Sequence, residues 1–229
     1  MTLRDLKFLN PFQFPSLSFR FRVPNALVAS QTAMFFVALC ATFSMTGLAW
    51  AETGVTAKTI LIGQSVSLTG PLASIGTDFS EGFKTYIDEV NRGGGVFGRQ
   101  LRVVLMDDGY VAQRSLFNTE KMITEDGVFA LAGNLGTGNV MAVLPLIADK
   151  RVPLFAPFTG ADSLHRTPNR YLFTVMASYG NEIEKMVQHL TTTGITSIAV
   201  AYQNNPFGKE GLSGVQAAMK DRQLVPVAL

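Results

Sequence analysis

Four short segments hold the side chains and backbone groups best suited to binding a small anion. Each follows a stretch that is typical of a β-strand, and three of the four are rich in Ser, Thr and Gly: residues 67–70, 107–110, 133–138 and 157–160. Hydroxyls, backbone N–H groups and the N-terminus of a following helix all stabilise a carboxylate. Thr137 and Thr159 are therefore candidate ligand-binding residues. The same groups cap helices, so plain capping is the alternative for both.

Two further motifs could indicate a nucleotide site, a metal site or catalysis. Gly133–Gly138 has the order G-x-x-G-x-G rather than the G-x-G-x-x-G of dinucleotide sites, and no Gly-Lys-Ser/Thr follows it. Asp107 and Asp108 could be catalytic acids or metal ligands, but neighbouring side chains on a strand point in opposite directions. A turn residue followed by a helix-start charge is the better interpretation.

The remaining candidates for catalysis are no stronger. His165 falls on a predicted loop and His189 on a predicted helix, and neither has a carboxylate or cysteine pattern nearby. The G-x-S-x-G motif of nucleophilic serines is absent from the sequence. The sequence therefore predicts a protein that is not an enzyme, with no catalytic residue, no cofactor and no metal site.

Three aromatic residues, Phe158, Tyr179 and Phe207, lie at or near predicted loops. Aromatic side chains at such positions can form the wall of a pocket for an apolar ligand group. A hydrophobic staple or a contact between domains would explain them equally well. The sequence leaves these alternatives open.

Strands and helices alternate along the chain beyond residue 58. Apolar runs predict strands at 59–65, 101–106, 128–132, 153–156, 171–175, 197–201 and 224–229. Helical spacing predicts helices at 78–91, 113–125, 139–150, 181–190 and 208–220. This alternation is typical of an α/β fold with a doubly wound parallel sheet and helices on both faces. Parallel strands end at one edge of a sheet, so we expect the four polar segments to lie together there.

The helix predicted at 78–91 has the clearest pattern. Its apolar face is expected to hold Phe79, Phe83, Tyr86, Ile87 and Val90. Asp78 and Glu81 fall in its predicted first turn, where negative charge complements the helix dipole. Glycines 93–95 should end the helix, since glycine accepts the left-handed conformation of a helix cap.

The first 51 residues have the pattern of a cleaved signal peptide. Residues 1–22 contain four basic residues and one acid, and residues 23–51 contain no Asp, Glu, Lys or Arg. Ala49 and Ala51 suit a signal-peptidase site, with cleavage before Glu52. An uncleaved membrane anchor is the alternative, although polar residues at 42, 44 and 46 interrupt the apolar run. A lipoprotein would be acylated at Cys40, but a bulky Leu39 precedes that residue.

Removing the leader changes the charge of the chain. Four of the 19 basic residues and one of the 17 acidic residues lie in 1–51, so the remaining 178 residues carry 15 basic and 16 acidic side chains. No cluster of Lys and Arg remains to neutralise phosphates, which argues against a nucleic-acid partner. These 178 residues also contain no cysteine, so neither a disulfide nor thiol chemistry is expected.

A series of short motifs occurs in order along residues 62–208. It comprises Ile62-Gly63, Ser67-Leu68-Thr69-Gly70-Pro71, Ile75-Gly76, Glu81-Gly82, Ile87-Asp88-Glu89-Val90-Asn91-Arg92-Gly93-Gly94, Gly98-Arg99, Asp107-Asp108, Pro157-Phe158-Thr159-Gly160-Ala161 and Phe207-Gly208. Together these motifs resemble those of periplasmic solute-binding proteins of the leucine/isoleucine/valine-binding type, which serve ABC transporters. The resemblance implies two α/β lobes that close on a ligand between them.

The resemblance also implies roles for individual residues. Thr137, with Gly138 beside it, would offer its hydroxyl and backbone N–H to the ligand carboxylate. Phe158 would offer its carbonyl to the ligand ammonium, and Thr159 and Gly160 would add polar contacts.

Two aromatic residues are implied further along the chain. Tyr179 matches a crossover position that can face the cleft, and Phe207 matches an aromatic residue of the second lobe that closes over the ligand. Ile75 replaces a common tyrosine, residues 136–138 include glycines where some members have bulkier residues, and Val175-Met176 replaces a common arginine. Leucine-like, aromatic-acid and amide ligands therefore all stay open.

The expected organisation is a signal peptide at 1–51, a first ligand-binding lobe at 52–178 and the start of a second lobe at 179–229. Proteins of the resembled type are considerably longer than the 178 residues that follow the leader. We therefore expect an incomplete second lobe, a truncated gene or reading frame, and weak ligand binding.

These observations predict the periplasmic solute-binding component of an ABC transporter, which captures a branched-chain amino acid or a similar small carboxylate or amide. The expected partners are an amino acid-like small molecule and an inner-membrane ABC permease; the protein is expected to be a monomer and not to bind nucleic acid. The alternatives are an exported sensor domain of the same fold and an exported α/β enzyme that uses Asp107 or Asp108.

Overall fold

The structure, a computed structural model, describes residues 52–166 and 168–229. The chain divides into two units, Met1–Trp50 and Ala51–Leu229, and all described residues belong to the second. The predicted signal peptide, its cleavage site after Ala51 and Cys40 therefore lie outside the described residues.

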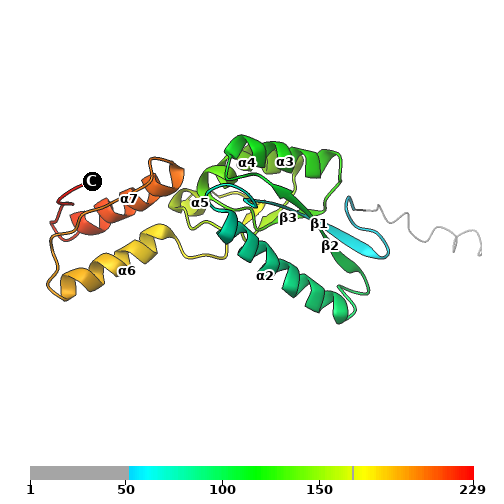
Figure 1. The fold of residues 1–229 in the computed structure, drawn as a ribbon, viewed down its shortest axis with the longest axis horizontal. Helices are drawn as coiled ribbons and strands as arrows, with labels where there is room; N and C mark the ends of the chain where they lie inside the picture. Colours follow the sequence, from blue (N-terminus) through cyan, green and yellow to red (C-terminus); the bar gives the residue numbers. More distant parts are fainter. Residues whose placement is uncertain (1–51, 167) are drawn as a thin grey trace, which may run out of the picture. The chain divides into compact units, whose positions relative to one another are not determined.

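A parallel five-stranded sheet organises the Ala51–Leu229 unit (Figure 1). The strands are β1 (Thr59–Val66), β2 (Gln100–Asp107), β3 (Ala130–Ala132), β4 (Leu154–Phe155) and β5 (Leu172–Phe173). Their order in the sheet is β2-β1-β3-β4-β5, and every pairing is parallel. The predicted α/β fold with a parallel sheet is confirmed. The strand order reverses between β1 and β3, and open α/β sheets bind ligands at the carboxyl side of such a switch point.

Helices cover both faces of the sheet (Figure 1). α2 (Ala73–Arg92) lies on one face, and α3 (Ala112–Thr124) and α4 (Thr137–Lys150) lie on the other. They are followed by α5 (Asp162–Arg166), α6 (Tyr179–Thr192) and α7 (Pro206–Lys220). Among the described residues, no helix is both long enough and apolar enough to cross a membrane.

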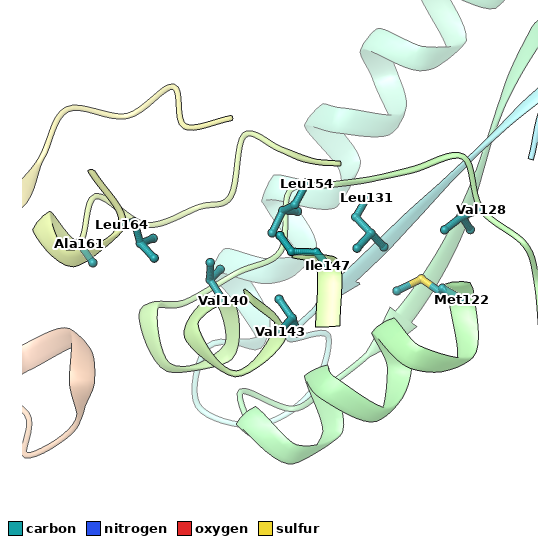
Figure 2. Packing of buried hydrophobic residues seen from close by; sticks show 9 residues of the cluster. All are labelled: Met122, Val128, Leu131, Val140, Val143, Ile147, Leu154, Ala161 and Leu164. Carbon is teal, nitrogen blue, oxygen red and sulfur yellow. The ribbon is translucent and has the colours of Figure 1, made fainter. Parts of the chain in front are cut away.

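The main hydrophobic core lies between the sheet and helices α3 and α4 (Figure 2). Nine buried residues form it: Met122, Val128, Leu131, Val140, Val143, Ile147, Leu154, Ala161 and Leu164. At Gly63 of β1 a Cβ atom would lie 2.8 Å from Met122 Sδ and 2.9 Å from Leu131 Cδ2, so a side chain there would require these core residues to move. A smaller cluster of Val187, Ala218 and Met219 joins α6 to α7.

α2 begins at Ala73, well before the predicted start at residue 78. Gly70, with φ +80°, turns the chain directly after β1, and the Ala73 N–H bonds to the Gly70 carbonyl at 3.2 Å. The predicted placement of Asp78 and Glu81 in the first turn is therefore wrong, and that turn contains no acid. Glycines 93–95 end the helix as predicted, with positive φ at 94 and 95.

Tyr86 is a second correction on α2. The prediction placed it on the buried face, but it is 70% exposed. It precedes the buried Ile87 by one residue, which rotates its side chain by about 100° around the helix. The residues of α2 that are buried are Gly76, Ser80 and Ile87.

The strands predicted at 197–201 and 224–229 do not form. Only Ala199 and Ala228 make a parallel bridge, supported by hydrogen bonds from Val200 N–H to Ala228 O (3.0 Å) and from Val227 N–H to Ile198 O (2.9 Å). Two extended segments without a third neighbour among the described residues do not make a stable sheet.

The other elements form within two residues of their predicted bounds. The difference matters for α4, which begins at Thr137 rather than at residue 139 and therefore includes Thr137 and Gly138 in its first turn. His165 lies in α5 and not on a loop, because a short helical turn follows β4.

Candidate functional site

The loops that follow β3 and β4 bring Thr137 and Thr159 together. Their hydroxyl oxygens are 2.7 Å apart, and both residues are fully buried. The Tyr179 hydroxyl donates to Thr159 Oγ1 at 3.3 Å, and the Ala161 N–H donates to the same oxygen at 3.3 Å. The expectation that these polar segments share one edge of the sheet therefore holds for the loops of Thr137 and Thr159.

The hydrogen bonds around Thr159 leave one proton unused. A hydroxyl oxygen accepts two hydrogen bonds and donates one. Either hydroxyl could donate in the Thr137–Thr159 pair; with Thr159 accepting from both Tyr179 and Ala161, the arrangement that satisfies all these bonds directs the Thr159 proton to Thr137 Oγ1. Thr137 then accepts that bond, and its proton is left for a further acceptor.

The N-terminus of α4, beside this hydroxyl, has no side-chain cap. Its N-cap residue, Gly136, has φ +99° and provides no side-chain cap. The first N–H groups of a helix have no intrahelical acceptor, and here they belong to Thr137, Gly138 and Asn139. The positive end of the helix dipole adds to the attraction of an anion at this position.

Asp107 joins the loop after β1 to the loop after β2. Its carboxylate accepts the Leu68 N–H at 2.8 Å, the Thr69 hydroxyl at 2.6 Å and the Gly109 N–H at 2.9 Å, among other bonds. Burial raises the pKa of Asp107, but the hydrogen bonds from Thr69, Gly109 and Leu68 outweigh it and hold the pKa below its ordinary value. These contacts give Asp107 a structural role.

Asp108 is fully buried and also faces β1. It accepts the hydroxyls of Ser65 (2.9 Å) and Ser67 (3.0 Å) and the N–H of Tyr110 (2.9 Å). The interpretation of Asp108 as a helix-start charge is wrong. Val111 is the N-cap of α3, and the Asp108 carboxylate accepts hydroxyls at the end of β1 instead. Both carboxylate oxygens therefore accept hydrogen bonds from within the protein.

A cavity of about 180 Å³ lies next to the α4 N-terminus. Its lining comprises Leu72, Ile75, Tyr110, Leu135, Gly136, Phe158, Tyr179, Gln203 and Phe207, with no acidic or basic side chain. Tyr179 and Phe207 meet edge to face at 5.5 Å between ring centroids, and Phe158 packs on Phe79 at 4.9 Å. The structure thus brings the three sequence-predicted aromatic residues to one cavity.

The two predicted glycines, like Thr137 and Thr159, are not among the residues that line this cavity. A Cβ at Gly160 would lie 3.0 Å from the Tyr179 ring, and the Gly160 carbonyl accepts the Tyr179 N–H at 2.7 Å. A Cβ at Gly138 would lie 3.5 Å from Pro206 at the start of α7. The Phe158 carbonyl already accepts the Gly136 N–H at 3.2 Å and keeps one lone pair.

Residues 59–227 match the family model described as periplasmic binding protein. The chain belongs to the periplasmic binding protein family. The resemblance to its leucine/isoleucine/valine-binding type is likewise confirmed. Members of this family are solute-binding proteins rather than enzymes.

Three relatives illustrate the likeness of this periplasmic binding protein. Leu/Ile/Val-binding protein homolog 3 of Brucella melitensis is 24% identical over 184 residues, which are 80% of this chain and 48% of that protein. A substrate-binding periplasmic protein from Ralstonia solanacearum is 36% identical with a TM-score of 0.71, over 74% of this chain and 48% of that one. A possible leucine/isoleucine/valine-binding protein from Rhodopirellula baltica is 31% identical with a TM-score of 0.71, over 76% and 47%. The chain spans about half the length of each.

Sequence reasoning singled out none of Tyr110, Leu72, Leu135 and Gln203 as site residues. Tyr110 and Leu135 lie inside the predicted polar segments 107–110 and 133–138, and that position was the available signal. Tyr110 directly follows the Asp-Asp-Gly turn, but nothing in the sequence shows that this turn directs its ring toward α4. Among residues 52–166 and 168–229, no group of three or more His, Cys, Asp or Glu side chains could hold a metal ion.

Proposed function

We propose that this periplasmic binding protein captures a small solute that carries a carboxylate and delivers it to the inner-membrane permease of an ABC transporter. The observation that carries the proposal is the uncapped N-terminus of α4, which includes the Thr137 hydroxyl and whose N-cap residue, Gly136, lines a cavity walled by aromatic rings. The carboxylate would accept bonds from Thr137 Oγ1 and from the N–H groups of the first turn of α4. No chemical step is required, because function is binding.

The cavity wall supports a small ligand with an apolar body. Leu72, Ile75 and Leu135 line it together with the aromatic rings, and such surfaces favour apolar ligand groups. Its volume of about 180 Å³ is below the roughly 300–1,000 Å³ of pockets for drug-sized ligands. A branched-chain amino acid or a similar small carboxylate or amide fits these properties.

The second part of the proposal concerns the other site residues. Phe158 would use its remaining carbonyl lone pair for a ligand ammonium, and Tyr179 and Phe207 would enclose the ligand body. Thr159, Gly138 and Gly160 would act without lining the cavity. Thr159 would direct its proton to Thr137, and Gly160 would support the Tyr179 ring. Gly138 would offer its backbone N–H to the carboxylate. The contact of Thr159 with Thr137, the contact of Gly160 with the Tyr179 ring and the place of Phe158, Tyr179 and Phe207 in the cavity lining support these roles.

The proposed organisation extends the family assignment. Residues 1–51 would be a signal peptide that is removed on export to the periplasm, 52–178 the first lobe and 179–229 the beginning of the second. Closure of the lobes on the ligand would select the conformation that the permease recognises. We expect the exported protein to act as a monomer without a cofactor.

Isothermal titration calorimetry of the full chain tests this function. The ligands are L-leucine, L-isoleucine, L-valine, L-phenylalanine and benzoate. For any ligand that binds, Thr137→Val should reduce the affinity about tenfold to a hundredfold, because a hydrogen bond to a charged group contributes about 1.5–3 kcal/mol. The matched control, Thr124→Val on the exposed side of α3, should leave the affinity unchanged. Failure of the wild-type chain to bind any small carboxylate would contradict the proposal.

A further inference from the structure

Tyr110 has a backbone conformation that tyrosine rarely adopts. Its φ is +64°, in the left-handed region, which costs a residue with a side chain on the order of 1–3 kcal/mol. Asp108 holds this conformation, since its carboxylate accepts the Tyr110 N–H at 2.9 Å and its carbonyl accepts the Val111 N–H at 3.0 Å. Asp108 is itself fixed by Ser65 and Ser67 at the end of β1. The fold therefore imposes the direction of the tyrosine.

The imposed conformation places the Tyr110 ring on the N-cap of α4. A Cβ at Gly136 would lie 2.4 Å from Tyr110 Cε2, so a side chain at position 136 is excluded by the ring. Gly136 also has φ +99°, which favours glycine for a second reason. The ring thus lies beside the uncapped N-terminus of α4 and lines the same cavity as Tyr179 and Phe207.

The Tyr110 hydroxyl has no hydrogen-bond partner among the residues that the structure describes, whereas the Tyr179 hydroxyl donates to Thr159 Oγ1. Burial, together with the nearby Tyr179 and Asp108, raises the pKa of Tyr110 above its ordinary value. The phenol therefore stays protonated at neutral pH and keeps a proton to donate. Two unused donors, this hydroxyl and that of Thr137, flank the N-terminus of α4.

We propose that Tyr110 is a ligand-binding residue that selects for a carboxylate, by donating its hydroxyl to the carboxylate bound at the N-terminus of α4. This inference rests on the proposed function and adds a donor that distinguishes the ionised acid from its neutral amide. A charged acceptor strengthens a hydrogen bond about twofold over a neutral one. The backbone conformation that Asp108 imposes on Tyr110 would hold the hydroxyl at the binding position before the ligand arrives.

The test is a titration of full-length Tyr110→Phe with acids and their amides: L-leucine with L-leucinamide, and benzoate with benzamide. The variant keeps the ring and loses only the hydroxyl. We expect its affinity for the acids to fall about tenfold to a hundredfold and its affinity for the amides to fall no more than about fivefold. Tyr86→Phe, at an exposed position of α2, is the matched control and should bind like the wild type.

The outcomes separate the two proposals. If the wild type binds an acid and Tyr110→Phe binds it equally well, the role of Tyr110 is overturned while the proposed function stands. Equal losses for an acid and its amide would overturn selection by this hydroxyl in the same way. If the wild type binds none of the probes, the proposed function itself fails. Equal melting temperatures of wild type and variant confirm that the comparison concerns binding and not folding.

Discussion

At the scale of single residues, Asp107 and Asp108 organise the loops after β1 and β2, on which the position of Tyr110 depends. Each carboxylate accepts several hydrogen bonds from the end of β1 or from the following turn. Two adjacent acids can suggest catalysis, yet every contact here stabilises loop geometry. The two acids therefore have a structural role in these loops.

Asp107→Asn should weaken the fold in a pH-dependent manner. The pKa of Asp107 is lowered in the folded state, so the ionised form stabilises the fold above the unfolded pKa of about 3.9, and this contribution is lost as the pH falls toward the folded pKa. Chemical unfolding at pH 7 should show the variant less stable than the wild type. At pH 3 the difference should shrink, and a constant difference at both values would contradict this reading of Asp107.

At the scale of elements, sequence periodicity predicts which segments are helical better than it predicts where they begin. α2 starts early because its first turn packs on the end of β1: a Cβ at Gly76 would lie 1.9 Å from the Ser67 carbonyl oxygen. That contact joins residues of two different segments, so the sequence pattern of α2 alone does not predict it. Residues 197–201 show the converse, since a strand-like composition does not form a strand without neighbours to pair with.

Gly76→Ala should therefore destabilise the protein by about 1–3 kcal/mol, because the added methyl group meets backbone that cannot move freely. Gly82→Ala on the same helix is the matched control, since nothing lies within 4 Å of its Cβ position. The control should stabilise the protein by about 0.5–1 kcal/mol through helix propensity. Thermal or urea unfolding measures both. A Gly76→Ala variant as stable as the wild type would show that the first turn of α2 does not pack closely on the end of β1.

At the scale of the whole Ala51–Leu229 unit, two separate hydrophobic clusters stabilise different parts. One lies between the sheet and α3 and α4, and the other joins α6 to α7. The parallel sheet allowed the meeting of Thr137 and Thr159 to be predicted from the sequence, because both follow strands of one sheet. The position of Tyr110 could not be predicted in this way, since it depends on a left-handed turn held by a buried acid.

The two clusters predict two units of local unfolding. Met219→Ala removes a fully buried side chain from the α6–α7 cluster, a change that typically costs about 2–5 kcal/mol. Amide hydrogen exchange should become faster in α6 and α7 and stay unchanged in β1. Leu131→Ala, in the other cluster, should make amide hydrogen exchange faster in β1 and leave it unchanged in α6 and α7. Equal acceleration in β1 and α7 by Met219→Ala would show one cooperative unit instead.

A crystal structure of the full chain with a bound carboxylate ligand tests the central claim most directly. We predict that one carboxylate oxygen lies within hydrogen-bonding distance of Thr137 Oγ1 and of an N–H in the first turn of α4. A ligand whose carboxylate lies elsewhere, with the N-terminus of α4 unoccupied, would contradict the proposed site.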